Sequence, residues 1–425
     1  MKPPPDLSLP HIVVVGAGFA GLNAAKTLAN RDDVSVIVVD HRNHHLFQPL
    51  LYQVATAGLN PADIAVPIRV QFRHAPNVDV RLGHVEGVDL ERQTVSVDGA
   101  GISFNYLILA CGARHSYFGH PEWEEFAPGL KTLEQATEIR RRMLVAFERA
   151  ENETDQEKQN AYLTFVIVGG GPTGVELAGA IADISRTAMR GDFRRIDPTK
   201  SHIMLVEAAP RVLTTFSAEV SERARRDLVE IGVEVRTNAK VEAIDGEGVT
   251  IASRKLYARS VFWAAGVQAE QLRIVPPPDT DRAARIKVSN DFSVPGHPNV
   301  FVVGDMAAFE IEPGRLLPGV APAAIQAGTH AAQMILGDLA GEPRRPFVYN
   351  DKGQLATIGK SRAVAQIGRV TLTGRIAWLT WLFVHVASLI GFRNRVAVLI
   401  NWIGSYMFSK REARLITEKE WRLRN

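Results

Sequence analysis

Cysteine is almost absent from the sequence, since Cys111 is the one cysteine among 425 residues. A single thiol cannot form a disulfide within the chain, ligate an iron–sulfur cluster or build a cysteine zinc site. It also excludes a redox-active cysteine pair. Cys111 follows an apolar run, Tyr106 to Ala110, and is expected to be a small core residue.

Strong net charge and low-complexity tracts are absent as well. The net charge of +3 is the small difference between 49 basic and 46 acidic residues, which gives no reason to expect nucleic acid as a partner. Hydrophobic residues make up 46% and charged residues 22%, as in a folded globular protein. The first ten residues lack the basic start and apolar run of a secretory signal, so the catalytic part is expected in the cytoplasm.

The chain contains an internal repeat. IVVVGAGFAGLNAAKTLA at Ile12–Ala29 and VIVGGGPTGVELAGAIA at Val166–Ala182 both predict a strand, a glycine turn and an amphipathic helix. Continuous apolar runs predict further strands in parallel sheets that are covered on both faces: Tyr106–Ala110, Ser260–Ala264 and Asn299–Val303. We therefore expect an α/β fold with two dinucleotide-binding, Rossmann-like domains, the second inserted in the first.

The expected boundaries follow from these repeats. Residues 1–112 and 267–341 would form the first dinucleotide-binding domain, and residues 113–266 would form the second. Residues 342–425 differ in character and are expected to form a C-terminal membrane-anchoring and dimerisation region.

The first glycine fingerprint follows the strand predicted at His11–Val15. Its glycines are Gly16, Gly18 and Gly21. The first allows a tight turn, the second lets the backbone approach a pyrophosphate, and the third lets helix and strand pack closely. The helix N-terminus then attracts the phosphates, and Asp40, about 20 residues on, can accept hydrogen bonds from a ribose. Asp305, after a buried strand and a glycine, needs a backbone amide or a ligand hydroxyl as its partner, and a ribityl hydroxyl of FAD is a good candidate.

The second fingerprint follows Thr164–Val168. Its glycines are Gly169, Gly171 and Gly174. Its acidic partner is expected to be Glu207, placed further on than usual because a basic stretch, residues 186–200, intervenes. A carboxylate there repels a 2′-phosphate and favours NADH over NADPH. Arg211 lies close enough to bind a 2′-phosphate, but its interpretation as a surface residue is favoured.

Five motifs, taken in order, carry a more specific resemblance. They are HHLFQPLLYQVATAG at His44–Gly58, SYFG at Ser116–Gly119, GGGPTGVELAG at Gly169–Gly179, VFVVGDMAA at Val300–Ala308 and APAAIQAG at Ala321–Gly328. With the first fingerprint, they make the chain resemble type II NADH dehydrogenases, most closely those of actinobacterial type, from about residue 11 to the C-terminus. The resemblance implies a flavoprotein that passes electrons from NADH through FAD to a membrane quinone without pumping protons. It also implies a peripheral homodimer on the cytoplasmic face of the cell membrane.

The resemblance assigns cofactor residues one by one. FAD would be held by Gly16, Gly18, Phe19, Ala20, Gly21, Asp40, Ala110, Gly112, Asp305, Ala324 and Lys352. NADH would be held by Gly169, Gly171, Pro172, Thr173, Gly174, Glu176, Glu207, Ala265 and Gly266. No metal site is implied.

Two residues are assigned to catalysis on the same basis. Glu176 matches a family glutamate near the nicotinamide and flavin, although a carboxylate in a helix's first turn is also favoured by the dipole. Gln326 matches the second glutamine of the quinone-side motif, whose first glutamine is replaced here by Pro322. Quinone reduction is therefore expected, with the quinone's identity left open. Lys352 matches a family lysine near the flavin or is an exposed loop lysine.

The C-terminal region carries two apolar runs, Ile376–Phe392 and Val396–Phe408. The first, as a helix of about 25 Å, is shorter than the roughly 30 Å hydrocarbon core of a bilayer. Flanking basic residues and interspersed aromatic residues predict helices that lie in one leaflet: Arg393, Arg395, Lys410, Arg411 and Arg414, with Trp378, Trp381, Trp402 and Tyr406. A buried dimer interface is the compatible alternative, and His385 is expected to be a hydrogen-bonded interfacial histidine.

Four competing functions have distinguishing features. Disulfide reductases and sulfide–quinone oxidoreductases need the cysteine pair that this chain lacks. A soluble reductase of the ferredoxin reductase type would have no such apolar C-terminal run. A flavin-bound redox sensor would bind a partner without turnover.

Overall fold

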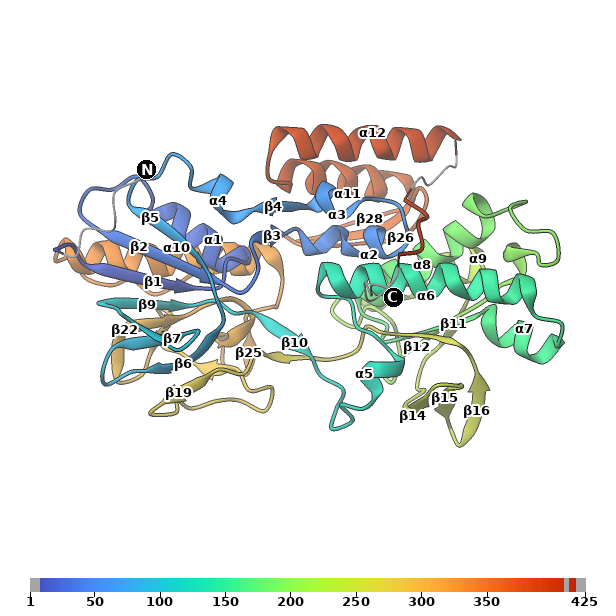
Figure 1. Ribbon diagram of the computed structural model, residues 1–425, viewed down its shortest axis with the longest axis horizontal. Helices are drawn as coiled ribbons and strands as arrows, with labels where there is room; N and C mark the ends of the chain where they lie inside the picture. The colour runs from blue at the N-terminus through green and yellow to red at the C-terminus, as the bar shows by residue number, and fades with distance from the viewer. Residues whose placement is uncertain (1–7, 409–412, 418–425) are drawn as a thin grey trace, which may run out of the picture. The chain divides into compact units, whose positions relative to one another are not determined.

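The computed structural model describes residues 8–408 and 413–417 (Figure 1). The chain forms two compact units. The first comprises Met1–Leu46, Ala65–Arg114 and Val267–Lys352, and the second comprises Phe47–Ile64, His115–Gly266 and Gly353–Asn425. The division between Arg114 and His115 falls within β10 (Ala113–His115).

The first unit is built on a six-stranded sheet with the order β21-β22-β9-β1-β2-β5. Its strands are β1 (His11–Val15), β2 (Ser35–Asp40), β5 (Val78–Leu82), β9 (Tyr106–Leu109), β21 (Ser293–Val294) and β22 (His297–Val302). β1 pairs in parallel with β2 and β9, and all three consist largely of buried valine, leucine and isoleucine. Such uniformly apolar strands are stable only where both faces are covered, which confirms the α/β fold expected from the sequence.

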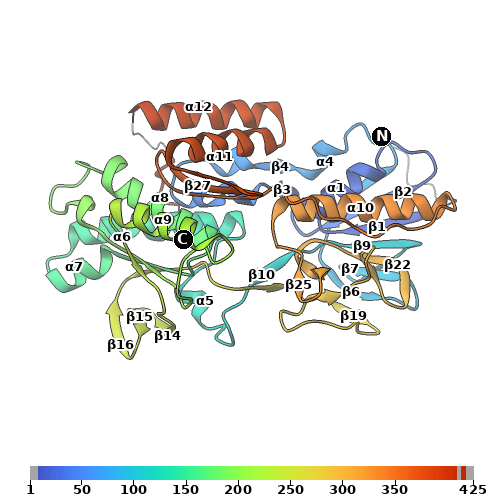
Figure 2. The same cartoon turned by 180° about the vertical axis from the view of Figure 1, so that it is seen from behind.

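Two helices, α1 (Phe19–Leu28) and α10 (Ala321–Leu339), cover one face of this sheet (Figures 1 and 2). They pack closely because Gly328 carries no side chain: a Cβ there would lie 2.0 Å from the carbonyl oxygen of Ala20. A smaller sheet lies on the other side, made of β19 (Arg273–Val275), β6 (Val85–Asp89), β7 (Thr94–Val97) and β8 (Ala100–Ser103). Short elements complete the unit: β3 (His44–Leu46), β4 (Ala65–Pro67), α4 (Ile68–Gln71), β18 (Val267–Ala269), β20 (Ile286–Lys287), β23 (Ala307–Ala308), β24 (Glu310–Glu312) and β25 (Arg315–Leu316).

The second unit has a four-stranded parallel sheet in the order β13-β12-β11-β17. Its strands are β11 (Thr164–Val168), β12 (His202–Val206), β13 (Val233–Arg236) and β17 (Ser260–Trp263). The helices are α5 (Trp123–Phe126), α6 (Leu133–Asn152), α7 (Gln156–Tyr162), α8 (Pro172–Asp183) and α9 (Ala218–Glu230), and an antiparallel sheet adds β14 (Val241–Asp245), β15 (Gly248–Ile251) and β16 (Arg254–Tyr257). The basic stretch after α8 begins as a π-helical segment, Ile184–Ala188.

Residues from Gly353 onward belong to this second unit. They form β26 (Gln354–Gly359), β27 (Arg362–Ile367), β28 (Val370–Thr373), α11 (Gly374–Ser388) and α12 (Phe392–Phe408), and the excursion at Phe47–Ile64 adds α2 (Leu51–Ala55) and α3 (Pro61–Ile64). Gly179 lets α8 pack directly on β26, since a Cβ there would lie 1.9 Å from the carbonyl oxygen of Ile358. This close packing groups the strands with the second unit, whereas the sequence predicted a separate region from residue 342.

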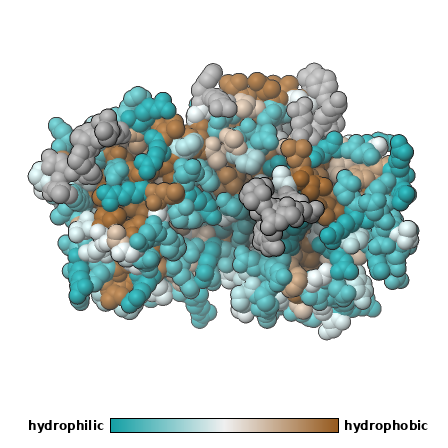
Figure 3. All heavy atoms as spheres, viewed as in Figure 1, coloured by the Kyte–Doolittle hydropathy of each residue, from teal (hydrophilic) through white to brown (hydrophobic). Residues whose placement is uncertain are grey.

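The C-terminal helices present apolar side chains to the outside. Ile376, Leu379 and Phe383 of α11 and Ile400 and Ile403 of α12 are all more than half exposed. Figure 3 shows hydrophobic residues gathered on the outer side of this helix pair. Among residues 8–408 and 413–417, no helix combines the length and the hydropathy needed to span a bilayer.

Among the aromatic residues from which helices in one leaflet were predicted, Trp381 is covered by other parts of the chain. Trp381 is only 2% exposed and stacks on His385, with 4.3 Å between ring centroids. Arg395 donates to the carbonyl of Leu389, and Arg414 pairs with Asp192. The sequence did not predict that Trp381 is covered, because an apolar run with little periodicity does not reveal which face packs on a neighbour. The side chains of Arg393 and Tyr406, and residues Lys410 and Arg411, lie outside the part that is described.

Candidate functional site

The first fingerprint forms a tight turn after β1. Gly16 has a φ of +92°, and a Cβ there would lie 2.4 Å from the carbonyl oxygen of Ala110. Gly21 packs on the turn itself, because its Cβ would lie 1.8 Å from the carbonyl oxygen of Gly16. Gly18 caps α1, and a Cβ added to it would have no neighbour within 4 Å, so the helix N-terminus opens onto free space. Open backbone at a helix N-terminus is what a pyrophosphate requires.

Asp40 anchors this turn. Its carboxylate accepts hydrogen bonds from the N–H groups of Ala17 and Arg42, both at 2.7 Å. His45 is buried beneath it, with Nδ1 2.9 Å from the carbonyl oxygen of Ala17. Burial lowers the pKa of His45, so it stays neutral at pH 7 and adds no charge beneath the turn.

Two further predicted FAD residues, Ala20 of α1 and Ala324 of α10, lie on either side of Gly304. A Cβ at Gly304 would lie 3.3 Å from the Cβ of Ala20 and 3.7 Å from that of Ala324. Asp305 follows in a 3₁₀ turn, Gly304–Met306, and is partly exposed. Phe19 begins α1 with its ring edge-on to His45, and Gly112 has a φ of +75° just after β9.

The side chain of Gln326 forms hydrogen bonds with the backbone of its own unit. Its side-chain amide donates to the carbonyl of Asn350 and accepts from the N–H of the same residue, both at 3.0 Å. This two-point bond holds the segment that leads to Lys352, whose side chain is exposed. Pro322 lies in the first turn of α10, where a missing N–H costs nothing.

The second unit repeats the fingerprint geometry. Gly169 has a φ of +110°, and a Cβ there would lie 2.6 Å from the backbone of Ala264 and 2.7 Å from that of Ala265. A Cβ at Gly174 would lie 1.8 Å from the carbonyl oxygen of Gly169, and Gly171 caps α8 beside open space. Pro172 and Thr173, the first residues of α8, are exposed at this end.

Glu207 anchors the second turn as Asp40 anchors the first. Its carboxylate accepts from the N–H of Gly170 at 2.6 Å and from that of Ala209 at 2.7 Å. Arg211, which the sequence left open as a phosphate ligand, donates to the carbonyl of Phe216 and the hydroxyl of Ser221. Arg211 therefore holds its own loop.

Gly266 follows β17 at the carboxyl end of the second sheet, the end at which the second fingerprint follows β11. It has a φ of +71°, and a Cβ there would lie 2.5 Å from the ring of Phe118. Phe118, in the SYFG motif, itself has a φ of +52° and is two-thirds exposed. An exposed ring at the carboxyl end of a parallel sheet lies where nucleotides bind in this kind of fold.

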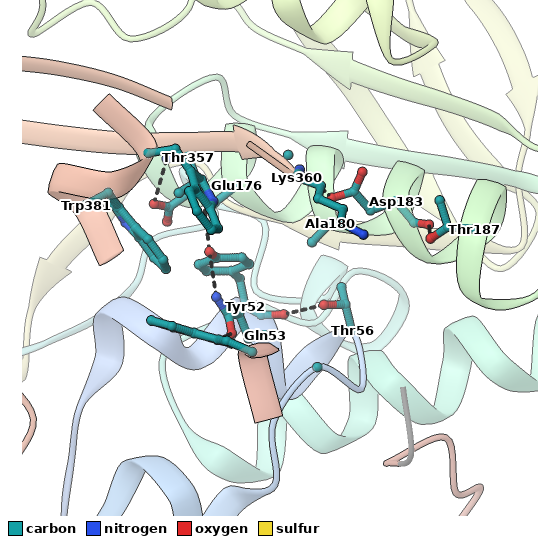
Figure 4. Close-up of a pocket in the computed structure, with 14 residues that line it drawn as sticks. Tyr52, Gln53, Thr56, Glu176, Ala180, Asp183, Thr187, Thr357, Lys360 and Trp381 are labelled. Carbon is teal, nitrogen blue, oxygen red and sulfur yellow. Dashed lines mark hydrogen bonds between the residues drawn. The ribbon is translucent and has the colours of Figure 1, made fainter. Parts of the chain in front are cut away.

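A pocket of about 840 Å³, including space open to solvent, lies in the second unit beside α8 (Figure 4). It is lined by polar side chains and a wall of three tryptophans: Tyr52, Gln53, Thr56, Glu176, Asp183, Thr187, Thr357, Lys360, Trp378, Trp381 and Trp402, with Gly58, Ala180 and Gly359. Aromatic walls with a few polar groups are typical of small-molecule sites.

Glu176 is an acidic residue that lines this pocket, as is Asp183. Glu176 is the fifth residue of α8, so the first-turn dipole does not explain it. Burial raises the pKa of Glu176 from 4.5 to about 8, against the opposing effect of the N–H of Thr357, which lies 3.4 Å from Oε1. At neutral pH the carboxyl group therefore carries a proton.

The sequence did not identify four polar residues of this pocket as site residues: Tyr52, Gln53, Thr357 and Trp402. The hydroxyls of Tyr52 and Thr357 lie 3.0 Å apart across 305 positions of the chain. The available signal was the polar pair Tyr52-Gln53 within the otherwise apolar run LLYQVA.

Comparisons with known proteins agree with this geometry. The chain matches the pyridine nucleotide-disulphide oxidoreductase family over residues 10–328 and the NDH2 C-terminal domain over residues 352–411. Two proteins of Mycobacterium tuberculosis, type II NADH:quinone oxidoreductases Ndh and NdhA, are each 43% identical to it. The alignment with Ndh covers 96% of this chain and 91% of the relative, and that with NdhA covers 96% and 90%.

Solved structures share the fold. NDH2 from Plasmodium falciparum in complex with NADH superposes with a TM-score of 0.87 at 20% identity, covering 96% of this chain and all of that one. The sulfide:quinone oxidoreductase of Aquifex aeolicus has a TM-score of 0.72 at 19% identity, covering 94% and 95%. The resemblance found from the motifs is thereby confirmed at the level of the family.

Proposed function

The chain belongs to the type II NADH:quinone oxidoreductases, and from that membership we propose that it passes two electrons from NADH through bound FAD to a membrane quinone without pumping protons. The observation that carries the proposal is the pocket in the second unit. It combines a protonated carboxyl group with a tryptophan wall, beside the helix that begins at the second fingerprint.

The first unit would hold FAD. The turn at Gly16 and the open N-terminus of α1 at Gly18 fit a pyrophosphate, and Asp40 keeps lone pairs for ribose hydroxyls after binding two backbone amides. Asp305 and Ala324 border the same helix end, where Asp305 would accept a ribityl hydroxyl. When bound, the flavin supplies the chemistry, accepting hydride from NADH and returning two electrons to the quinone.

The second unit would hold NADH. Gly171 leaves space for the pyrophosphate at the N-terminus of α8, and Glu207 would accept hydrogen bonds from the adenine ribose. The same negative charge repels a 2′-phosphate, which favours NADH over NADPH. Arg211 does not counter this preference because its guanidinium group is bonded within its own loop.

The tryptophan-lined pocket would receive the quinone. Trp378, Trp381 and Trp402 offer flat apolar surfaces to a planar ring and keep water away. Glu176 would hold a proton near the ring's carbonyl oxygens, and a carboxyl group whose pKa lies near the working pH can donate and recover protons efficiently. Gln326 would act indirectly, by fixing the segment before Lys352.

The helix pair α11–α12 would bind the cytoplasmic surface of the membrane. Its exposed isoleucine, leucine and phenylalanine side chains can enter one leaflet, and the same apolar surface can pair in a homodimer. Attachment there would bring the second unit to the bilayer, in which a lipid-soluble quinone is dissolved.

The test is steady-state turnover of the full chain, loaded with FAD and reconstituted on vesicles. We expect NADH oxidation that depends on added ubiquinone or menaquinone analogues and is much slower with NADPH. Turnover with a soluble protein acceptor but with neither quinone would favour the ferredoxin reductase type. Flavin binding without turnover on any acceptor would favour a sensor.

A further inference from the structure

Three hydrogen bonds connect α12 to the polar end of the pocket in the second unit. The indole Nε1–H of Trp402 donates to Oε1 of Gln53 at 2.7 Å. Nε2 of Gln53 donates to the hydroxyl of Tyr52 at 3.0 Å, and that hydroxyl lies 3.0 Å from Oγ1 of Thr357 (Figure 4).

The direction of this chain of bonds is determined by its first member. An indole N–H can only donate, so the amide of Gln53 must present its oxygen to Trp402 and its NH₂ group to Tyr52. The Tyr52 oxygen therefore accepts. Since a phenol is a better donor than an aliphatic alcohol, its own proton points to Oγ1 of Thr357.

Thr357 then has a proton left to donate. Its side chain lines the pocket on β26, and among the described residues its hydroxyl has the bond with Tyr52 and no other. The two other threonines that line the pocket are different: Thr56 donates to the carbonyl of Tyr52, and Thr187 donates to that of Asp183. Thr56 and Thr187 thus spend their hydroxyl protons on backbone carbonyls four residues earlier. The Thr357 hydroxyl instead accepts from Tyr52, and its own proton is left for another acceptor.

We propose that the Thr357 hydroxyl donates a hydrogen bond to a carbonyl oxygen of the quinone, and that Trp402 sets this donor direction through Gln53 and Tyr52. The inference rests on the proposed function and adds a positioning residue to it. The backbone N–H of the same residue faces Glu176, so Thr357 would hold one carbonyl oxygen of the quinone beside the proton-carrying group. A fixed donor also suits the acceptor-only oxygen of an oxidised quinone better than the hydroxyl of the quinol product.

The test compares Thr357→Val with Thr357→Ser in the full chain loaded with FAD. Binding of a short-chain quinone analogue is measured by quenching of tryptophan fluorescence, and KM and kcat are measured by NADH oxidation. We expect Thr357→Val to raise Kd and KM about five- to tenfold, as for the loss of one hydrogen bond, with a smaller effect on kcat. Thr357→Ser should bind as the wild type does. Thr164→Val, a buried strand threonine that donates to the carbonyl of Asn160, is the matched control and should change neither constant.

The direction set by Trp402 is tested by a double-mutant cycle. Gln53→Met removes the amide that links Trp402 to Tyr52 and keeps the tryptophan wall, so it should weaken quinone binding by itself and add little in the Thr357→Val background. Wild-type-like binding by Thr357→Val, equal losses in the Val and Ser variants, or additive effects of the two substitutions would each overturn the inference. If Thr357→Val does not fold, Tyr52→Phe replaces it in the test. This variant removes the proton that the Thr357 hydroxyl accepts, so we expect weaker quinone binding. Unchanged binding by Tyr52→Phe would overturn the inference. Quenching by the quinone without any turnover would instead contradict the proposed function.

Discussion

The carboxylate of Glu207 lies 2.6 Å from the N–H of Gly170, the residue after the first fingerprint glycine of its unit. Asp40 stands in the same relation to Ala17, at 2.7 Å, in the other unit. Each carboxylate also accepts a hydrogen bond from the N–H of the residue two positions later: Ala209 for Glu207 and Arg42 for Asp40. The acidic residue of each fingerprint is therefore part of the glycine turn, and a change there should affect both the turn and ribose binding.

Replacing Glu207 should weaken NADH binding and narrow the preference for NADH. Glu207→Ala removes two charge-assisted hydrogen bonds from the turn and the charge that repels a 2′-phosphate. We expect KM for NADH to rise by about tenfold, equivalent to roughly 1.4 kcal/mol, and the NADH/NADPH ratio of kcat/KM to fall by a similar factor. Glu207→Gln keeps one acceptor oxygen and should have a smaller effect on KM. Glu234→Gln, on the neighbouring strand, is the control, and an unchanged NADH/NADPH ratio in Glu207→Ala would assign specificity to another residue.

Glu176 should make both stability and turnover depend on pH. Because its pKa is raised from 4.5 to about 8, the folded chain binds more protons than the unfolded chain between these values, and stability decreases as pH rises through this window. Glu176→Gln cannot ionise, so its Tm should match that of the wild type near pH 4.5 and exceed it at pH 9. A difference in Tm that does not vary with pH would contradict the raised pKa.

The same substitution should slow quinone reduction. If the protonated carboxyl donates in the reaction, kcat of the wild type falls above about pH 8, whereas Glu176→Gln is slow, by on the order of 10²-fold, at every pH. The pH profile of kcat with a saturating quinone analogue measures this. A variant with full activity and an unchanged profile would exclude Glu176 as the proton donor.

Gly179 should be needed to build the pocket. A Cβ there would lie 1.9 Å from the carbonyl oxygen of Ile358, which neighbours Thr357 on β26. Gly179→Ala must push the strand away from α8, and we expect a loss of about 1–3 kcal/mol in stability with weaker quinone binding. Gly337→Ala, in α10, has 3.7 Å of room and should preserve or raise Tm. Thermal unfolding of both variants checks the difference, and equal Tm values would contradict the close packing.

The outer face of α11–α12 should bind membranes. Phe383 and Ile400 are 72% and 62% exposed, and burying such a side chain in lipid contributes about 1.5–3 kcal/mol. The double variant Phe383→Glu with Ile400→Glu should lower the vesicle-bound fraction in flotation with anionic lipids. Val370→Glu, at a position that is 57% exposed on β28, serves as the control for added charge. Undiminished binding by the double variant would exclude this face as the anchor.

Local signals predicted the geometry of the two glycine turns well. The glycine spacing and the following carboxylates are short-range features, and the structure gives Gly16 and Gly169 the positive φ values that such turns require. Gly21 and Gly174 occupy the close helix–strand approach that the spacing predicted.

The pocket could not be predicted from short-range patterns. Gln53 and Trp402 are 349 positions apart, and their hydrogen bond depends on how α2 and α12 pack within the second unit. The burial of Trp381 could not be predicted either, because composition marks a helix as apolar without showing which side chains a neighbouring element covers.

A single-turnover experiment tests electron transfer from NADH through the flavin to a quinone most directly. The FAD-loaded protein is mixed without oxygen with NADH, and then with a quinone analogue, while flavin absorbance is followed. We predict that NADH bleaches the flavin absorbance and that the quinone restores it within the time of steady-state turnover. A flavin that NADH does not reduce, or a reduced flavin that quinone does not reoxidise, would contradict the proposed function.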